Sequence, residues 1–420
     1  MGIVESWDRF RDRYRILASV EPELKPASAY LNWARTNWEM RRRTATIGAR
    51  PLKLTFDPIS VCQLRCPLCP TGRRLQDRGS GHAKLHIFQH LMEEIGNDLF
   101  FIDFYNWGEP LLNKHLEDMV ELASSKRIMT SMSSNLSLPL TDERARRLVG
   151  SGLGELICSL DGATQETYAT YRRRGDFALA VENLRKIVRA KKELGSSRPS
   201  IVWRMYVFNF NEHEVEDARA LAEEVGVDRF VLGTPYLEND QFEMPETERD
   251  EARSWASSDP SRNRYHPSHP EYVDSARNTA IRSRCDWHYL STAINPDGGV
   301  APCCAVFKKA HDFGSLEEPG DPPAAVPYMD VVNNPSFVSI RDRFAGRRNE
   351  PTGLVCEECP TPDLMSYGRI MNRQVAFLTM VSFFERIRRF GRPGIAVKRW
   401  AASPVADSDQ VPMVSPKASS

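Results

Sequence analysis

The sequence predicts an α/β fold, in which a barrel or partial barrel of six βα units precedes a small cysteine-rich domain. Two observations predict it. Between residues 51 and 236, short apolar runs alternate with stretches of helical periodicity, which is typical of βαβ units and a parallel sheet. Right-handed crossovers curl six such units into a barrel or part of one, a partial (β/α)6 barrel. Beyond the barrel, five of the nine cysteines fall within residues 285–365.

Six apolar runs mark the expected strands. In chain order they are LKLTFDP, FFIDFYN, IMTSMSSN, ELICSLDG, SIVWRMYVF and RFVLGTP. Helical stretches separate them, and two of these, DERARRLVGSG and EVEDARALAEEVG, end near a glycine, as helices commonly do. Strands that alternate with helices in this way predict a parallel sheet with its loops gathered at one end.

Composition divides the chain into five parts. We expect a helical N-terminal extension, the barrel, a polar linker or lid rich in Pro, Ser and Asp, the cysteine-rich domain, and a basic helical tail that is partly disordered. Two interpretations of the tail stay open: a helix on an anionic membrane surface, or a helix packed on the barrel with a solvated basic face. The parts are residues 1–50, 51–236, 237–284, 285–365 and 366–420.

Charge and targeting signals exclude several classes of protein. The 420 residues carry 56 acidic and 56 basic side chains, so no overall field favours a nucleic-acid partner. There is no signal peptide and no apolar run near the roughly 18 residues that span a bilayer. We therefore expect a cytoplasmic protein, peripheral to the inner membrane surface if the tail binds lipid. In a reducing compartment, clustered cysteines are metal ligands or catalytic groups rather than disulfides.

The most informative stretch is SVCQLRCPLCPTG, which contains Cys62, Cys66 and Cys69 in a C-x3-C-x2-C array. It follows the first expected strand, where parallel barrels build their active sites. A structural zinc site takes four protein ligands, so this array would need a distant Cys or His to complete it. An iron–sulfur cube takes one ligand per iron, so three thiolates leave one iron open to another molecule.

With its neighbours, this array resembles the radical S-adenosylmethionine (SAM) superfamily, and the resemblance extends over residues 51–235. It implies that Cys62, Cys66 and Cys69 hold a [4Fe-4S] cluster. It also implies that the open iron binds the amino and carboxylate groups of SAM. No glycine-rich Rossmann loop follows the first strand, which excludes an ordinary polar methyltransferase.

Further motifs in barrel order support the resemblance. FYNWGEP resembles the family's G-G-E-P element, with Trp107 in place of the first glycine, and implies that Glu109 binds the SAM ammonium. SMSSN and CSLDG resemble the third-strand and fourth-strand elements. Arg172 in TYRRRGDF is expected to meet the SAM carboxylate, with Arg204 on the fifth strand as its competitor. The cofactor-binding residues implied are Gly108, Glu109, Pro110, Ser134, Asn135, Ser159, Asp161 and Arg172.

The second cysteine array resembles the start of a SPASM or twitch extension, which binds auxiliary clusters. Cys285 and Cys303 frame a C-x12-G-x4-C pattern, and CEEC supplies Cys356 and Cys359. These four are the expected ligands of one auxiliary [4Fe-4S] cluster. Cys304 is left over, either as a ligand in place of Cys303 or as a packed thiol. A zinc ribbon is the structural alternative.

The resemblance implies a radical SAM oxidoreductase that makes a 5'-deoxyadenosyl radical and removes a hydrogen atom from its substrate. The outcome is dehydrogenation or epimerisation, with Cys158 as a candidate hydrogen donor if its thiol faces the barrel lumen. We expect a small or carbohydrate-like substrate and an external one-electron reductant such as flavodoxin or ferredoxin. Two alternatives remain: a radical SAM maturase of a ribosomal peptide, and a structural zinc-binding protein.

Overall fold

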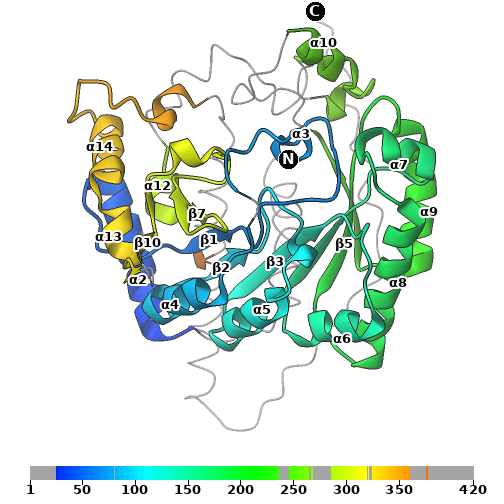
Figure 1. Cartoon of the computed structure of the whole chain (residues 1–420), viewed down its shortest axis with the longest axis horizontal. Helices are drawn as coiled ribbons and strands as arrows, with labels where there is room; N and C mark the ends of the chain where they lie inside the picture. Colours follow the sequence, from blue (N-terminus) through cyan, green and yellow to red (C-terminus); the bar gives the residue numbers. More distant parts are fainter. Residues whose placement is uncertain are drawn as a thin grey trace, which may run out of the picture.

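The computed structural model describes residues 25–79, 81–235, 246–263, 266–267, 285–318, 320, 324–359 and 375–376. Within them, nine strands form one sheet in the order β6-β5-β4-β3-β2-β1-β7-β8-β9 (Figure 1). Neighbours from β6 to β7 pair in parallel, and β7–β8 and β8–β9 pair antiparallel. The strands are β1 (Lys53–Phe56), β2 (Phe101–Asp103), β3 (Met129–Ser134), β4 (Glu155–Ser159), β5 (Ser200–Tyr206), β6 (Arg229–Gly233), β7 (Ser291–Ile294), β8 (Gly299–Ala301) and β9 (Gly314–Ser315), and a separate hairpin joins β10 (Glu317–Glu318) to β11 (Ala324–Ala325).

Local sequence signals start and stop the helices. Thr141, Thr164 and Asp176 each cap a helix, because their side chains accept from a backbone N–H three residues on. Gly226 ends α9 with φ 85°, a left-handed conformation that favours glycine. The helices are α2 (Ala27–Arg42), α3 (Pro70–Arg73), α4 (Leu85–Ile95), α5 (Leu116–Ser125), α6 (Asp142–Gly150), α7 (Gln165–Tyr171), α8 (Phe177–Glu193), α9 (Val215–Val225), α10 (Glu246–Ser254), α12 (Trp287–Leu290), α13 (Tyr328–Val332) and α14 (Pro335–Phe344).

All six expected strands are present as β1 to β6, and the partial barrel with its cysteine-rich C-terminal part is confirmed. The cysteine-rich region does not stand apart from the barrel, however. Its strand β7 pairs with β1, so β7 to β9 continue the barrel sheet. This pairing covers the backbone edge that β1 would otherwise expose.

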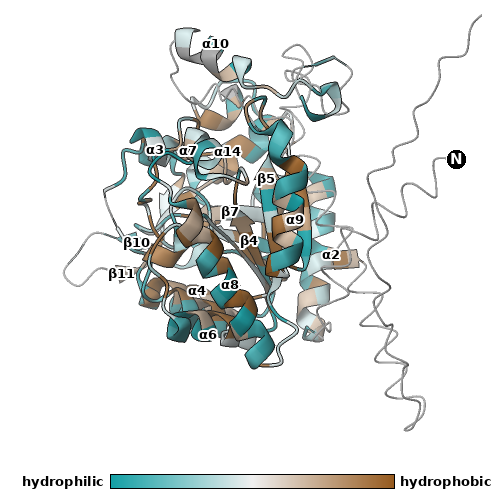
Figure 2. Ribbon diagram, turned by 90° about the vertical axis from the view of Figure 1, so that its right-hand side faces the viewer, coloured by the Kyte–Doolittle hydropathy of each residue, from teal (hydrophilic) through white to brown (hydrophobic). Residues whose placement is uncertain are grey.

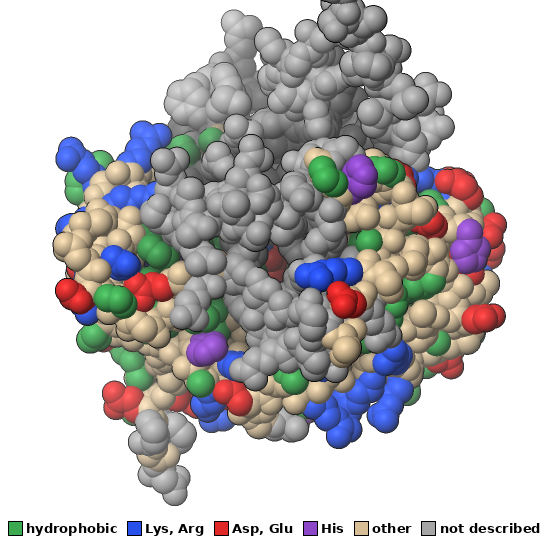
Figure 3. All heavy atoms as spheres, turned by 90° about the horizontal axis from the view of Figure 1, so that it is seen from above, with side chains coloured by type: hydrophobic (Ala, Val, Ile, Leu, Met, Phe, Trp, Pro, Cys, Tyr) green, Lys and Arg blue, Asp and Glu red, His purple; other side chains and the backbone are tan. Residues whose placement is uncertain are grey.

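Some sequence predictions fall outside the described residues. These include the first 24 residues, most of the expected lid, and the tail apart from Val375 and its neighbour. Within the described residues, no helix is both long and apolar enough to cross a membrane. In Figure 3, acidic, basic and apolar side chains are interspersed around the described rim of the upper face, as the balanced composition predicts.

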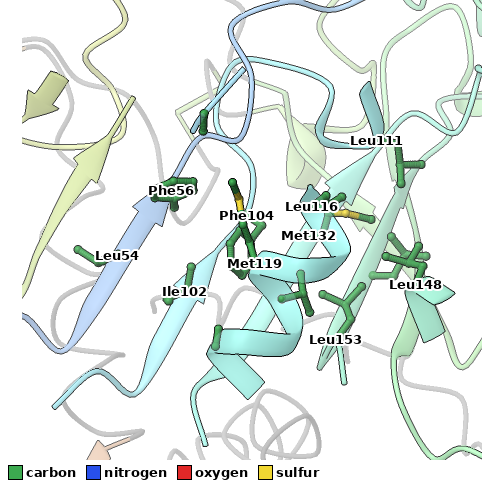
Figure 4. Close-up of a cluster of buried hydrophobic side chains, with 14 of the residues drawn as sticks. Leu54, Phe56, Ile102, Phe104, Leu111, Leu116, Met119, Met132, Leu148 and Leu153 are labelled. Atoms are coloured by element: carbon green, nitrogen blue, oxygen red, sulfur yellow. The ribbon is translucent and has the colours of Figure 1, made fainter. Parts of the chain in front are cut away.

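The two faces of the barrel sheet differ in polarity, because successive strand residues point to opposite sides. On the outer face, Leu54, Phe56, Ile102, Phe104 and Met132 are buried in one apolar cluster with residues of α4 and α5 (Figure 4). Hydrophilic and hydrophobic residues alternate along α8 and α9, as expected of helices with one buried face (Figure 2). The inner face therefore carries the residues between these apolar positions, and many of them are polar.

Arg78 joins the first barrel loop to the cysteine-rich region. Its guanidinium donates to both carboxylate oxygens of Asp312 at 2.6 Å and to Asp297 at 3.1 Å. Its Nε also donates to the carbonyl of Phe307 at 3.2 Å. The Arg78 side chain is only 2% exposed, and a bidentate pair of this kind fixes both distance and orientation. It holds the two cysteine-bearing regions in register.

Candidate active site

The first three cysteines lie on the loop between β1 and α3. Cys66 is buried, and its carbonyl accepts from the N–H of Cys69 at 3.2 Å, which closes a tight turn. Gly72 in α3 permits this turn, because a Cβ there would lie 2.4 Å from the carbonyl oxygen of Cys66. The local packing therefore turns the chain back over the cysteines.

The donor set fits an iron–sulfur cluster. Burial and then the Glu109 carboxylate raise the pKa of the Cys62 thiol, and burial raises the pKa of Cys66 to about 11. Such thiols keep their protons unless a metal replaces them. Within the described residues, no three Cys, His, Asp or Glu side chains converge closely enough for a single metal ion. A cube instead binds each thiolate through a separate iron, so its three cysteines need not meet at one ion.

Glu109, Ser134 and Asn135 form one connected group beside this loop. The Glu109 carboxylate is 2% exposed and accepts from Ser134 Oγ at 2.7 Å and from the Asn135 N–H at 2.9 Å. It also accepts from Asn135 Nδ2 at 2.6 Å and from the Leu111 N–H at 3.1 Å. Burial raises the pKa of Glu109, although these bonds oppose the shift. The SAM ammonium would therefore compete with Ser134, Asn135 and Leu111 for the oxygens of the Glu109 carboxylate.

We expect Glu109→Gln to weaken SAM binding about 10- to 100-fold, which corresponds to the roughly 1.5–3 kcal/mol of a hydrogen bond to a charged group. The NH2 group of the new glutamine side chain would also face two of the groups that now donate hydrogen bonds to the Glu109 carboxylate. Calorimetric titration of the reconstituted protein with SAM measures the effect. The matched control is Glu143→Gln, an exposed residue in the first turn of α6. Native SAM affinity in Glu109→Gln would contradict the assignment.

Gly108 allows the Glu109 loop to pass beneath the cysteine loop. A Cβ at Gly108 would lie 1.8 Å from the carbonyl oxygen of Ile59, so backbone atoms would have to move. We expect Gly108→Ala to destabilise the protein by about 1–3 kcal/mol and to lower iron retention. Gly150→Ala is the control, because nothing lies within 4 Å of a Cβ there. Equal thermal midpoints for the two variants would contradict this prediction.

Arg172 is the arginine that reaches the cysteine loop. Its Nη1 lies 4.0 Å from Cys66 Sγ, and its Nε donates to Asp161 Oδ2 at 2.6 Å. The other oxygen of Asp161 accepts from the Tyr206 N–H at 2.7 Å. Asp161 thus orients Arg172 instead of facing the loop itself. Arg204 contacts Ser159 and Ser133 at 3.3 Å on the inner face of the sheet.

Cys158 does not face the lumen. It is 0% exposed and belongs to the outer apolar cluster with Leu156, Leu160 and Trp203. Ser159, one residue on, bonds Ser133 and Arg204 on the inner face, so strand alternation requires Cys158 to face outward. Its expected role as a hydrogen donor to a substrate in the lumen is therefore not supported.

The second array brings together the four cysteines expected to bind the auxiliary cluster. Burial and then the nearby Cys359 thiol act to raise the pKa of Cys285 to about 12. Burial raises the pKa of Cys303, and the thiols of Cys304, Cys356 and Cys359 act in the same direction; Cys285 and Cys359 act likewise on Cys356. The charges that act on Cys304 are instead those of Lys53 and Asp103 in the barrel. Cys285 and Cys304 both pack against the buried cluster that contains Cys303, so Cys303 remains the predicted ligand and the choice between the two adjacent thiols is left to experiment.

Two supporting residues escape motif analysis. Asp57 accepts from the Trp107 N–H at 3.0 Å, and its own N–H donates to the Ile294 carbonyl at 2.8 Å. Burial raises its pKa to about 7, although backbone bonds act in the opposite direction. Gln63 donates to Asn135 Oδ1 at 2.8 Å and so ties the cysteine loop to the Glu109 group. An acid directly after an apolar strand, as in TFDP, is the signal that could have found Asp57.

Two family models match the chain. Residues 57–222 match the radical SAM superfamily, so the barrel part of the chain is a radical SAM domain. Residues 285–360 match SPASM, an iron–sulfur cluster-binding domain, which places the chain among the members with this C-terminal domain. The two domains imply a SAM-binding [4Fe-4S] cluster and auxiliary iron–sulfur binding, as the sequence predicted.

Several proteins are similar to parts of this chain. The mycofactocin maturase MftC of Mycobacterium ulcerans is 27% identical over 176 residues, which are 42% of this chain and 45% of that protein. The GTP 3',8-cyclase of Peptoclostridium acidaminophilum is 27% identical over 207 residues, 47% of this chain and 61% of that protein. The match thus spans less than two thirds of either relative. The structure of Streptococcus suis SuiB bound to S-adenosylmethionine shares the fold with a TM-score of 0.50 and 12% identity, over 84% of this chain and 82% of that chain.

Proposed function

We propose that this protein is a radical SAM maturase that modifies a peptide. The similarity to the mycofactocin maturase, over 176 residues, is the observation that carries the proposal. The sequence alone favours a small or carbohydrate-like substrate, and the similarity to a maturase supports the peptide alternative better. The zinc-binding alternative fits less well, because both cysteine arrays fall within iron–sulfur family models.

When bound, SAM and its cluster supply the radical that removes a hydrogen atom from an unactivated C–H bond, and the auxiliary cluster supplies an acceptor for one further electron. The chain's own residues hold and orient these groups. Cys62, Cys66 and Cys69 would bind the first cluster, and Glu109 would bind the SAM ammonium. Arg172, oriented by Asp161 at 2.6 Å, would meet the SAM carboxylate.

Net oxidation is the outcome that we propose for the peptide. The substrate loses a hydrogen atom, then one electron and one proton, so that a new double bond or crosslink forms. Epimerisation would instead need a thiol in the lumen to return a hydrogen atom. Cys158 faces the outer core, but the charges of Lys53 and Asp103 on the inner face act on the Cys304 thiol, so the assay below separates the two outcomes. Cys285, Cys303, Cys356 and Cys359 would hold the auxiliary cluster, and a flavodoxin or ferredoxin would supply the reducing electron.

The test compares substrates in one anaerobic assay. Reconstituted protein, SAM and dithionite are incubated with synthetic peptides encoded beside the gene, and in parallel with GTP and sugar phosphates. We expect 5'-deoxyadenosine in step with a peptide that loses the mass of two hydrogen atoms. A peptide whose mass stays unchanged in H2O but rises by one deuterium in D2O would indicate epimerisation. Turnover of GTP or a sugar phosphate without any peptide product would overturn the proposal.

A further inference from the structure

Five charged side chains lie on the inner face of the barrel sheet, and four of them are paired. Lys53 pairs with Asp103, which also accepts from Ser131 Oγ at 2.7 Å. Arg229 pairs with Glu155 at 2.7 Å. The fifth charged side chain is that of Arg204, and within the described residues it has no carboxylate partner. Among the described residues, the inner face therefore carries one cation that is hydrogen-bonded to no carboxylate, although Glu155 lies close enough for their charges to interact.

Arg204 is held in place by weak neutral contacts. Its Nη2 donates to the hydroxyls of Ser133 and Ser159, each at 3.3 Å, and these hydroxyls lie 3.1 Å apart. Its guanidinium lies 5.1 Å from the ring centre of Tyr206. Its Nε is buried and donates to no acceptor in the part of the chain that the structure describes. Burying a charged guanidinium with an unpaired N–H destabilises the folded protein unless an anion accepts a hydrogen bond from it.

The geometry of these groups suits a carboxylate. A carboxylate accepts two parallel bonds from one edge of a guanidinium, here the Nε and Nη2 edge. Such a fork would replace the two long serine contacts and use the vacant Nε. Ser133 and Ser159 could then donate their hydroxyls to the same anion. Three strands, β3, β4 and β5, contribute one residue each, so the site is built on rigid elements.

Arg172, and not Arg204, is the arginine placed to bind the SAM carboxylate. A molecule that chelates the first cluster must lie against the cysteine loop, and Arg172 Nη1 is 4.0 Å from Cys66 Sγ. The largest charge effects on Cys62 and Cys66 come from Glu109 and Arg172, respectively, not from Arg204. Arg204 instead lies next to Ser133 and Ser159 on the inner strand face, where a substrate would enter.

We propose that Arg204, Ser133 and Ser159 form an anion subsite that binds a carboxylate of the substrate. Because this deepens the proposed function, the carboxylate is an Asp or Glu side chain or the C-terminus of the peptide. The subsite would fix the distance between that acid and the carbon that loses hydrogen. Substrates with a neutral amide at the same position would bind poorly.

Two matched pairs of probes test the subsite on the reconstituted full chain with SAM bound. The peptide pair is N-acetyl-glutamate N-methylamide and its glutamine isostere, and the non-peptide pair is glutarate and glutaramide. We expect the native protein to bind the acid of each pair about 10-fold or more tightly than the amide. Arg204→Gln should abolish this preference and Arg204→Lys should reduce it, because lysine keeps the charge but loses the fork. Arg185→Gln on the surface of α8 is the control for a lost arginine.

The outcomes separate this inference from the proposed function. If acid and amide bind the native protein equally, or if neither binds, the subsite is overturned. If Arg204→Gln loses SAM affinity while it keeps the acid preference, Arg204 serves the cofactor and the subsite is overturned. If only the glutarate pair shows an Arg204-dependent preference, the subsite stands and the peptide proposal fails. Retention of SAM binding in Arg204→Gln also reports that the variant has folded.

Discussion

Replacing Cys62, Cys66 and Cys69 together by alanine is expected to abolish SAM cleavage and to lower the iron content from about eight to about four per chain. The three thiols lie on one loop after β1, and each would bind a separate iron of one cube. Loss of all three therefore removes that cube as a unit. The auxiliary site draws on other residues, after position 284, and should keep its own iron.

Iron and sulfide are counted on protein purified and reconstituted without oxygen, and 5'-deoxyadenosine is measured after addition of SAM and dithionite. Cys158→Ala is the control, because that thiol is buried in the outer apolar cluster and belongs to neither cysteine array. About four irons in the native protein would remove the auxiliary cluster and the oxidative outcome. Zinc in place of iron would overturn the enzyme assignment.

Features encoded by neighbouring residues could be predicted from the sequence. Each strand of the barrel is a short apolar run, and the cysteine loop follows the first of them directly. The Glu109, Ser134 and Asn135 group could also be anticipated, because each residue follows a parallel strand at the same end of the sheet. The structure adds that the Glu109 carboxylate is already bonded by four donors.

Side-chain direction was harder to predict. Asp161 and Arg172 both match motifs, yet only their 2.6 Å contact shows that one orients the other. The outward direction of Cys158 could have been inferred, because an inward Ser159 requires its neighbour to face the opposite side. Cys303 and Cys304 are adjacent in a loop without a regular period, so the sequence could not choose between them.

Contacts between distant segments left no local signal. The pairing of β7 with β1 joins residues more than two hundred positions apart, and the hydrophobic pattern of neither strand predicts it. The same holds for Arg78 and Asp312, whose bidentate contact aligns the cysteine-rich region with the first loop. These contacts explain how two arrays far apart in sequence share one sheet, which a linear succession of domains does not suggest.

The choice between Cys303 and Cys304 is testable in the background that lacks Cys62, Cys66 and Cys69, where only the auxiliary iron remains. We expect Cys303→Ala to lose most of the remaining four or so irons, because Cys303 completes the C-x12-G-x4-C pattern that begins at Cys285. We expect Cys304→Ala to keep them, because its thiol is influenced by Lys53 and Asp103 instead.

Adjacent residues in one loop make this a closely matched pair of variants. Each substitution removes one sulfur from the same turn, buried in Cys303 and half-buried in Cys304, so a general loss of packing would affect both variants. Iron analysis and the electron paramagnetic resonance signal of the reduced protein report the cluster directly. The reverse pattern, with iron lost only in Cys304→Ala, would show that Cys304 is the cluster ligand and that Cys303 is not. Equal loss in both variants would mean that the turn as a whole, and not one thiolate, holds the auxiliary site.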